Sequence, residues 1–351
     1  MTKHELYCIL SIIGLLNALA ADERIDRMTD YIKKLADRMT DHSDSDWAMN
    51  INHFDWVPGV GLFGIYNAYE ETKDKKYLDF LISWADTHID EAYDMQTVNS
   101  TAPLLTIKKL YDITGNEKYL KVCTDVAENL ITTAPLTSYG GLEHTVTEEG
   151  ADFHGQVWAD TLFMAGLFLL EMGEKKYVDF AAKQFLIHHR KLQANDSLYY
   201  HGFNGKDHMS AVKWGRANAW IVYSSAAFLE KTDNDEIKKY LMNHINALKK
   251  VQRKNGGFGT ILDEDASYDE LSATAGIIAG IKKAVSIGVV DSSCADMCDT
   301  AVITDNINEK GELEKVSTGT PVMPDKGAYM NIPLCPTLYG QGLAILALRK
   351  Y

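Results

Sequence analysis

Apolar residues recur at helical spacing along most of the chain. Residues 23–39 (ERIDRMTDYIKKLADRM) and 273–285 (ATAGIIAGIKKAV) carry apolar side chains three and four positions apart, so these side chains share one helix face. No set of segments with alternating β-branched residues competes with this pattern. The pattern therefore predicts an all-α protein.

One short pattern recurs four times and indicates a repeat. An apolar helix ends, a polar turn follows, and a Lys-Tyr pair opens the next helix. The tyrosines of these pairs are 42, 58 and 63 residues apart, and they are Tyr77, Tyr119, Tyr177 and Tyr240. Each interval accommodates two helices and their loops, and about six such pairs fit in the chain. We expect a closed toroid of helical hairpins, with an open helical solenoid as the alternative.

A buried acid stands out in the stretch QVWADTLFMAG, residues 156–166. From Trp158 to Met172 the chain is apolar nearly all round, which predicts a buried helix. Asp160 costs free energy there unless it is paired, caps a helix or has a function. Because Asp is favoured at helix starts, a cap is the simpler interpretation.

The loops outside the repeated turns are rich in aromatic residues, His and Gly, with few lysines. Flat aromatic rings stack on the faces of pyranose sugars, so these loops together favour a carbohydrate site. They are residues 53–61, 139–145, 198–205, 212–220, 255–260 and 317–324.

Composition narrows the class of protein. The chain has 351 residues, of which 46% are apolar, and no Pro/Gly/Ser-rich linker divides it, so one large domain over residues 21–351 is expected. The net charge of −14 argues against nucleic acid and anionic membranes as partners. Cys294 and Cys298 form a C-x-x-x-C pair, but no second pair completes a zinc site. No phosphate-loop, dinucleotide, HExxH or GxSxG motif occurs.

The N-terminus allows two interpretations. Residues 7–20 are apolar, Lys3 precedes them, and Ala18-Leu19-Ala20 fits a signal-peptide cleavage site, although Glu5 does not suit such a leader. With residues 1–20 as a signal peptide the protein would be exported, to the periplasm or outside the cell. With these residues as a first packed helix it would be cytoplasmic.

Several motifs occur in the order of a known family. They are WVPGVGLFGIYNAYEETKDKKYL, GGLEHT, VWADTLFMAG, LYYHGF, KWGRANAW, ELSATAG, VSTGT and LYGQGLAILAL. Over roughly residues 25–351 the chain resembles the unsaturated glycuronyl hydrolases of glycoside hydrolase families 88 and 105, the group that contains unsaturated rhamnogalacturonyl hydrolases.

The resemblance implies an (α/α)6 barrel and hydrolysis without a metal or organic cofactor. Such enzymes act on oligosaccharides left by polysaccharide lyases, whose non-reducing uronate carries a C4=C5 double bond. They hydrate that bond, and the resulting hemiketal breaks down to release the shortened sugar. The expected substrate is an unsaturated oligosaccharide derived from pectin, ulvan or glycosaminoglycan, with the uronyl-rhamnose type favoured. A monomer or homodimer is expected.

The resemblance also assigns two catalytic positions. Asp160 matches the general acid/base, and its apolar surroundings are expected to raise its pKa. Asn99 stands where the family often has a second Asp. An amide cannot act as a base, but it can orient water or bind a sugar hydroxyl. Asn99 is also a plausible cap for a helix from Ala102. Without a like charge near Asp160, we expect a more acidic pH–rate limb than in an Asp-containing relative.

The substrate-binding residues follow from the same motifs. His144 and His201 match site histidines that would hold hydroxyls or the uronate carboxylate. Arg216 is expected to bind that carboxylate through its guanidinium fork, with a structural salt bridge as the alternative. The residues expected to stack on sugar rings, or else to pack in the core, are Trp214, Trp220 and Trp56. The residues expected to close the pocket floor are Ser317, Gly319 and Thr320, and those expected near the leaving sugar are His208 and Lys213.

Two rival functions stay open at this point. An ordinary inverting glycosidase would need two carboxylates about 6.5–9.5 Å apart, and Asp152 with Glu143 or Glu148 could supply them. A non-catalytic sugar-binding toroid is favoured by Asn99.

Overall fold

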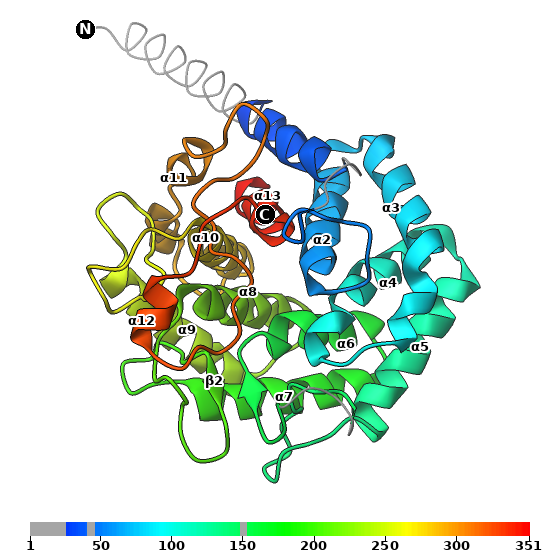
Figure 1. The fold of residues 1–351 in the computed structure, drawn as a ribbon, viewed down its shortest axis with the longest axis horizontal. Helices are drawn as coiled ribbons and strands as arrows, with labels where there is room; N and C mark the ends of the chain where they lie inside the picture. Colours follow the sequence, from blue (N-terminus) through cyan, green and yellow to red (C-terminus); the bar gives the residue numbers. More distant parts are fainter. Residues whose placement is uncertain (1–25, 41–45, 148–152) are drawn as a thin grey trace, which may run out of the picture.

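The computed structural model describes residues 26–40, 46–147 and 153–351, whose helices form two concentric layers (Figure 1). The inner layer consists of α2 (Trp56–Thr72), α4 (Ala102–Thr114), α6 (Leu167–Met172), α8 (Gly215–Lys231), α10 (Leu271–Ser286) and α13 (Leu338–Leu348). The outer layer consists of helical residues 26–39, α3 (Lys75–His88), α5 (Glu117–Thr132), α7 (Lys175–Leu192) and α9 (Asp235–Val251).

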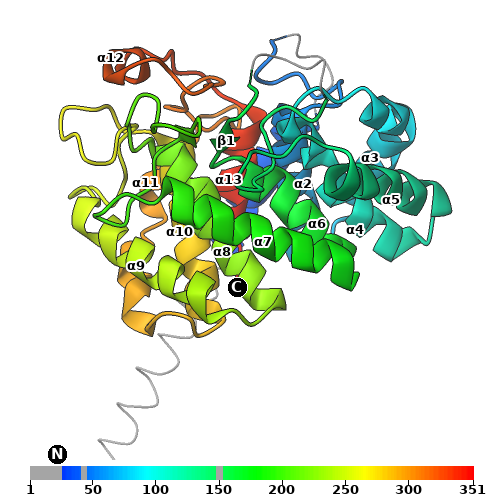
Figure 2. The same ribbon diagram turned by 90° about the horizontal axis from the view of Figure 1, so that it is seen from below.

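Shorter elements connect the long helices. They are the 3-10 helices η1 (Ile89–Tyr93), η2 (Val98–Thr101) and η4 (Ser292–Met297), the π-helix η3 (Leu162–Gly166), and the single turns α11 (Ala301–Thr304) and α12 (Lys326–Met330). The strands β1 (Val157–Trp158) and β2 (Gly202–Phe203) form one antiparallel pair. Figure 2 shows β1 and α12 at the same end of the ring.

The ring of inner helices is closed. Each inner helix contacts the next one along the chain, and α13 contacts α2. The last contact joins the first and the last inner helices, which an open solenoid would leave apart. The predicted toroid is therefore confirmed, and the solenoid alternative is wrong.

Sequence explains which helices lie inside. Every residue of α13 is buried, whereas α9 buries only one face. An inner helix touches neighbours on all sides, so it must be apolar all round. Small residues allow the closest contact: a Cβ added to Gly64 of α2 would lie 2.5 Å from Cα of Gly342 in α13.

The repeated tyrosines link successive outer helices. The hydroxyl of Tyr119 in α5 donates to Asp86 of α3 at 2.7 Å, and that of Tyr177 in α7 donates to Glu128 of α5 at 2.7 Å. Tyr77 of α3 makes the same kind of bond to Asp37, and the ring of Tyr240 in α9 stacks on His189 of α7. The repeat thus marks the first turn of α3, α5 and α7 and the second turn of α9, and at each place the tyrosine packs against the helix before it.

The stretch around Asp160 differs from the single helix predicted to begin at Trp158. Val157 and Trp158 form β1, a turn at Asp160 follows, and the chain then enters η3 before α6. A π-helix carries one extra residue per turn, and such turns occur frequently at functional sites. The strand places Trp158 on a loop wall instead of in the inner layer.

Two sequence predictions fall outside the described residues. The predicted signal peptide, residues 1–20, is one, and the carboxylates Glu148 and Asp152 are the other. In the described part of the chain, no helix combines the length and apolarity needed to cross a membrane.

Candidate functional site

A cavity of about 490 Å3 opens where the inner helices begin. Trp56 is the first residue of α2, Asn99 lies just before α4, Asp160 just before η3, and Trp214 directly before α8. Helix N-termini carry a partial positive charge, which opposes the negative charge of the carboxylates Asp55, Asp94 and Asp160 in the cavity lining. The cavity is lined by Trp47, Phe54, Asp55, Trp56, Asp94, Gln96, Thr97, Asn99, Ser100, His144, Phe153, Trp158, Asp160, Trp214, Gly319, Thr320 and Pro321.

Asp160 is a nearly buried carboxylate on the cavity wall. It is 5% exposed, and its Oδ2 has no hydrogen-bond partner among the residues that the structure describes. Its backbone carbonyl accepts hydrogen bonds from the N–H groups of Phe163 and Met164, so the main chain enters the helix here. Its side chain accepts no recorded hydrogen bond from the first N–H groups of that helix. The cap interpretation of Asp160 is therefore not supported. A buried, unpartnered oxygen facing a cavity is suited to a ligand or a water molecule.

His201 forms the one ion-pair contact that the structure records for the side chain of Asp160 in the described residues. Its Nε2 lies 3.3 Å from Oδ2 of Asp160, although the geometry falls short of a hydrogen bond. On the other side of the ring, Nδ1 lies 2.7 Å from the hydroxyl of Tyr329. His201 is 1% exposed, and burial lowers its pKa despite the opposing charge of Asp160.

The pKa of Asp160 is not raised as the sequence predicted. Burial does raise it, but the approach of the His201 ring leads the opposing effects, which outweigh burial and hold the pKa below its usual value. The resting site therefore contains an ionised Asp160. The prediction was wrong because the apolar residues next to Asp160 in sequence do not reveal the two histidines that the fold brings to it.

His144 stacks flat on Trp158, with ring centroids 3.7 Å apart. It is 2% exposed, and burial lowers its pKa to about 3, while Asp160 partly opposes the shift. His144 is therefore neutral near pH 7. The backbone of His144 bonds to Gln156 and Val98, which fixes its loop between the turn before Asp160 and the turn that carries Asn99.

Asn99 lies in η2 and faces the same cavity. It is 7% exposed, and its Oδ1 is buried without a hydrogen-bond partner in the described part of the chain. The residue at the start of α4 is Thr101, so Asn99 does not cap that helix. The cap interpretation of Asn99 is not supported, and its side chain is available to a ligand.

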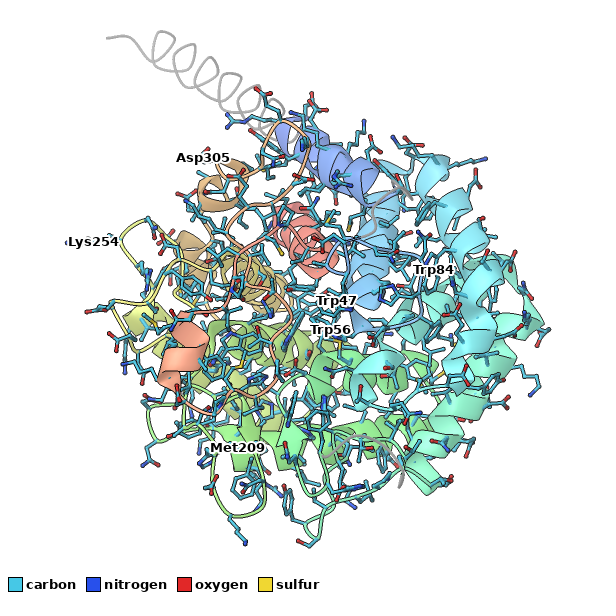
Figure 3. The ribbon with its side chains drawn as sticks, in the orientation of Figure 1. Trp47, Trp56, Trp84, Met209, Lys254 and Asp305 are labelled. Carbon is cyan, nitrogen blue, oxygen red and sulfur yellow. The ribbon has the colours of Figure 1, made fainter. Side chains whose placement is uncertain are left out.

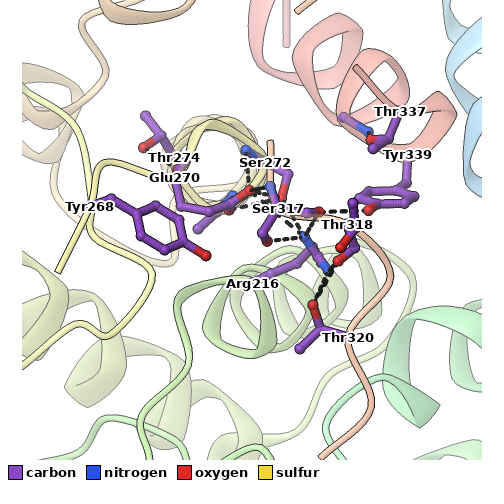
Figure 4. Close-up of polar contacts among 12 residues, drawn as sticks. Arg216, Tyr268, Glu270, Ser272, Thr274, Ser317, Thr318, Thr320, Thr337 and Tyr339 are labelled. Carbon is purple, nitrogen blue, oxygen red and sulfur yellow. Dashed lines mark hydrogen bonds and ion pairs between the residues drawn. The ribbon is translucent and has the colours of Figure 1, made fainter. Parts of the chain in front are cut away.

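Arg216 does not line the cavity. It is completely buried, and Figure 4 shows its guanidinium enclosed by Ser272, Ser317 and the 318–320 loop. Nη1 donates to Ser272 and Ser317, and Nη2 donates to the carbonyl of Thr318 and the hydroxyl of Thr320. Oε1 of Glu270 lies 3.7 Å from Nη1.

The prediction that Arg216 binds the substrate carboxylate is therefore corrected. Both terminal nitrogens of its guanidinium donate to the protein, and the alternative of a structural ion pair describes it. Arg216 still contributes to the cavity, because it holds Thr320 and lies over the ring of Trp214 at 4.4 Å, and both of these residues line the cavity.

The predicted stacking tryptophans divide into two groups. Trp56 and Trp214 line the cavity, whereas Trp220 is fully buried in α8 and packs on Phe163. Trp220 is therefore a core residue, since the sequence does not show which side of an inner helix faces the mouth. Figure 3 shows Trp47 beside Trp56 over the middle of the ring, and Trp47 is 47% exposed at the cavity edge.

The remaining predicted site residues also separate. Gly319 and Thr320 line the cavity, whereas Ser317 lies beneath it and binds Arg216. His208 stacks on Tyr200, and neither His208 nor Lys213 lines the cavity. Lys213 pairs with Asp196 and Asp263 of neighbouring loops.

Some lining residues were missed by sequence analysis. Asp55 and Asp94 add two carboxylates to the cavity, and Asp55 accepts a hydrogen bond from Ser100 at 3.1 Å. Asp55 lies in the aromatic loop 53–61, so its position was indicated although its residue type was not singled out. Glu143, one of the carboxylates considered for an inverting glycosidase, contacts His154 and does not line the cavity.

No group of three or more His, Cys, Asp or Glu side chains in the described residues is arranged to hold a metal ion.

Comparison with known proteins points in one direction. The model of Glycosyl Hydrolase Family 88 matches residues 27–351. The unsaturated rhamnogalacturonyl hydrolase YesR of Bacillus subtilis (strain 168) is 32% identical over 333 residues, which cover 91% of this chain and 93% of YesR.

Solved structures agree with this match. A possible member of the GH105 family from Salmonella enterica serovar Paratyphi A is similar with a TM-score of 0.87 at 31% identity, covering 92% of this chain and 93% of that one. The unsaturated glucuronyl hydrolase of Bacillus sp. GL1 has a TM-score of 0.74 at 17% identity, with 91% and 94% covered, and so shares the fold.

Proposed function

Since the chain belongs to Glycosyl Hydrolase Family 88, we propose that it removes 4,5-unsaturated uronic acid from the non-reducing end of lyase-generated oligosaccharides. The observation that carries the proposal is the nearly buried Asp160, whose free Oδ2 shares one cavity with Asn99 and His144. The name of YesR supports unsaturated uronyl-rhamnose disaccharides as the preferred substrates.

Asp160 acts as general acid and then as general base. Its carboxyl proton is transferred to C4 of the double bond, and a water molecule adds its oxygen to C5 and returns a proton to Asp160. The product at C5 is a hemiketal, which opens to a ketone, and the hemiacetal left at C1 releases the shortened sugar. One water molecule is consumed and Asp160 is regenerated. General acid–base assistance of this kind is worth roughly 10²–10⁴-fold in rate.

Substrate binding supplies the proton that the resting site lacks. Asp160 is ionised in the free protein, because the approach of the His201 ring lowers its pKa against the effect of burial. A bound uronate brings a second carboxylate into the cavity and expels water, and both changes raise the pKa of a neighbouring acid. The proton is then taken up with the substrate.

Neutral donors recognise the uronate carboxylate. No Lys or Arg is among the residues that line the cavity in the described chain, and His144 is neutral. The helix N-termini around the mouth and the amide of Asn99 offset the negative charge of the substrate, as is common at helix starts. Trp56 and Trp214 supply flat faces for the sugar rings.

An inverting glycosidase is a second candidate, favoured by Asp55 and Asp94. Both carboxylates line the same cavity as Asp160, and an inverting enzyme requires a second carboxylate as base. Such an enzyme would cleave a saturated uronyl oligosaccharide, which the proposed hydration cannot.

The reaction run in D2O separates the two candidates. Hydration transfers one solvent deuteron to C4, and NMR of the early product detects one deuterium at that carbon. Glycosidic cleavage leaves C4 without deuterium and also proceeds on saturated substrate. A product without deuterium at C4 would refute the proposed mechanism. Asp160→Asn is the control, and it should form product at less than about one hundredth of the wild-type rate.

A further inference from the structure

Tyr329 connects a cavity wall to the catalytic acid. It lies in α12, which follows the loop residues Gly319, Thr320 and Pro321 that line the cavity. Its side chain is fully buried, and its hydroxyl lies 2.7 Å from Nδ1 of His201. The opposite ring nitrogen of His201 is the atom that approaches Asp160.

The hydrogen bonds of Tyr329 determine which nitrogen of His201 carries the proton. The backbone N–H of Met323 donates to the hydroxyl oxygen of Tyr329 at 3.2 Å. The phenol keeps its own proton, because burial raises the pKa of Tyr329 to about 12. That buried proton needs an acceptor. The side chain of Ser210 also lies near the hydroxyl, but Nδ1 of His201, at 2.7 Å, is the acceptor at hydrogen-bond distance that the structure records. A neutral imidazole that accepts at Nδ1 carries its proton at Nε2.

We infer that Tyr329 is a positioning residue, which holds His201 in the Nε2–H tautomer so that His201 donates toward Asp160 and cannot accept the proton of Asp160. The catalytic meaning of this inference rests on the proposed function. When substrate binding protonates Asp160, C4 of the substrate is then the acceptor for that proton. The other tautomer would turn a lone pair of Nε2 toward Asp160 and let His201 take the proton instead.

The charges around the pair are consistent with this arrangement. His144 faces Asp160 and is neutral, and Arg216 faces His201 and disfavours a second proton on its ring. The negative charge of Asp160 also raises the pKa of Tyr329, which stays an uncharged phenol. A donor at Nδ1 adds to the effect of Arg216, so His201 stays neutral.

The first test is the tautomer itself, measured without substrate. Long-range ¹H–¹⁵N NMR of the full chain labelled at histidine, with His201 assigned from a His201→Gln sample, distinguishes the two neutral tautomers. We expect the proton on Nε2 near pH 7. A proton on Nδ1, or an imidazolium, would overturn the inference. This result does not depend on whether the protein turns over any substrate.

The second test removes the hydroxyl. In Tyr329→Phe, Nδ1 loses its donor, so His201 protonates more easily and its charge lowers the pKa of Asp160 further. We expect kcat on the unsaturated disaccharide to fall at least about tenfold, with little change in KM. A fall of this size lies within the rate factor that general acid–base catalysis contributes. The acidic limb of the pH–rate profile should move to lower pH.

Tyr268→Phe is the matched control for this substitution. Its hydroxyl donates to the backbone carbonyl of Tyr329 at 3.4 Å and makes no recorded contact with His201. We expect wild-type kcat and an unchanged His201 signal. A Tyr329→Phe protein with the pH profile and kcat of the Tyr268→Phe control would contradict the inference. If Tyr329→Phe fails to fold, the tautomer of the wild type still decides.

Discussion

Replacing Arg216 by Met should destabilise the protein by about 3 kcal/mol. The substitution leaves Glu270, which is completely buried, without its cationic neighbour. Breaking a buried ion pair on one side costs roughly 3–5 kcal/mol. The lower end of this range applies here, because the carboxylate of Glu270 still accepts hydrogen bonds from two backbone N–H groups. One belongs to Ala273 at the start of α10, and the other to Ser317.

Urea unfolding followed by circular dichroism measures this loss. Arg190→Met is the matched control, because Arg190 pairs with Glu236 through two hydrogen bonds on the exposed outer surface, where solvent screening leaves such a pair little effect on stability. The double substitution Arg216→Met with Glu270→Gln should recover part of the loss, since no buried charge is then left unpaired.

Two results would refute the structural role of Arg216. One is a loss in Arg216→Met no larger than in Arg190→Met. The other is an Arg216→Lys protein of wild-type stability whose KM for the unsaturated disaccharide rises strongly. The second result would mean that Arg216 contacts the substrate carboxylate, as the sequence predicted.

Two further predictions concern pH. Asn99→Asp adds a like charge to the cavity of Asp160, so the acidic limb of the pH–rate profile should move upward; an unchanged limb in the two proteins would disprove the effect. His188 and His189 are fully buried, and burial lowers their pKa values to about 4 and about 3. Because the unfolded chain binds protons below pH 6.5 that the folded protein does not, stability is complete above that pH and falls as the pH drops toward these values. At pH 5 each of these two histidines should have lowered the free energy of unfolding by about 2 kcal/mol. His188→Phe should therefore lower the slope of the unfolding free energy against pH by about 1.4 kcal/mol per pH unit. Urea unfolding midpoints at several pH values measure this slope. A slope equal to the wild-type slope would contradict the assignment.

The architecture was predictable because its cause is local. The Lys-Tyr pairs mark the beginnings of outer helices, and in three of the four the tyrosine hydroxyl donates to a carboxylate of the preceding helix, as Tyr119 does to Asp86. The apolar runs without a polar face mark inner helices such as α13. Both signals occur within a few residues, so the closed ring could be inferred from sequence.

The site was predictable only in part, because its properties depend on residues far apart in the chain. His144, Asn99 and Asp160 meet at one cavity as the motifs indicated. Arg216 and Trp220 lie four residues apart on one inner helix. Both side chains are buried away from the cavity, and the neighbouring sequence does not show this orientation. The lowered pKa of Asp160 likewise depends on histidines from two other loops.

The central claim is that Asp160 catalyses hydration of an unsaturated uronyl sugar. The conjugated C=C–carboxylate of such a sugar absorbs in the ultraviolet, and hydration removes that absorbance. We would incubate the protein with lyase-generated disaccharides from pectin, ulvan and glycosaminoglycans, beside Asp160→Asn. The account predicts a loss of absorbance that is fastest with a uronyl-rhamnose disaccharide and at least about 10²-fold slower in Asp160→Asn. Unchanged absorbance with all three, or equal rates for the two proteins, would contradict it.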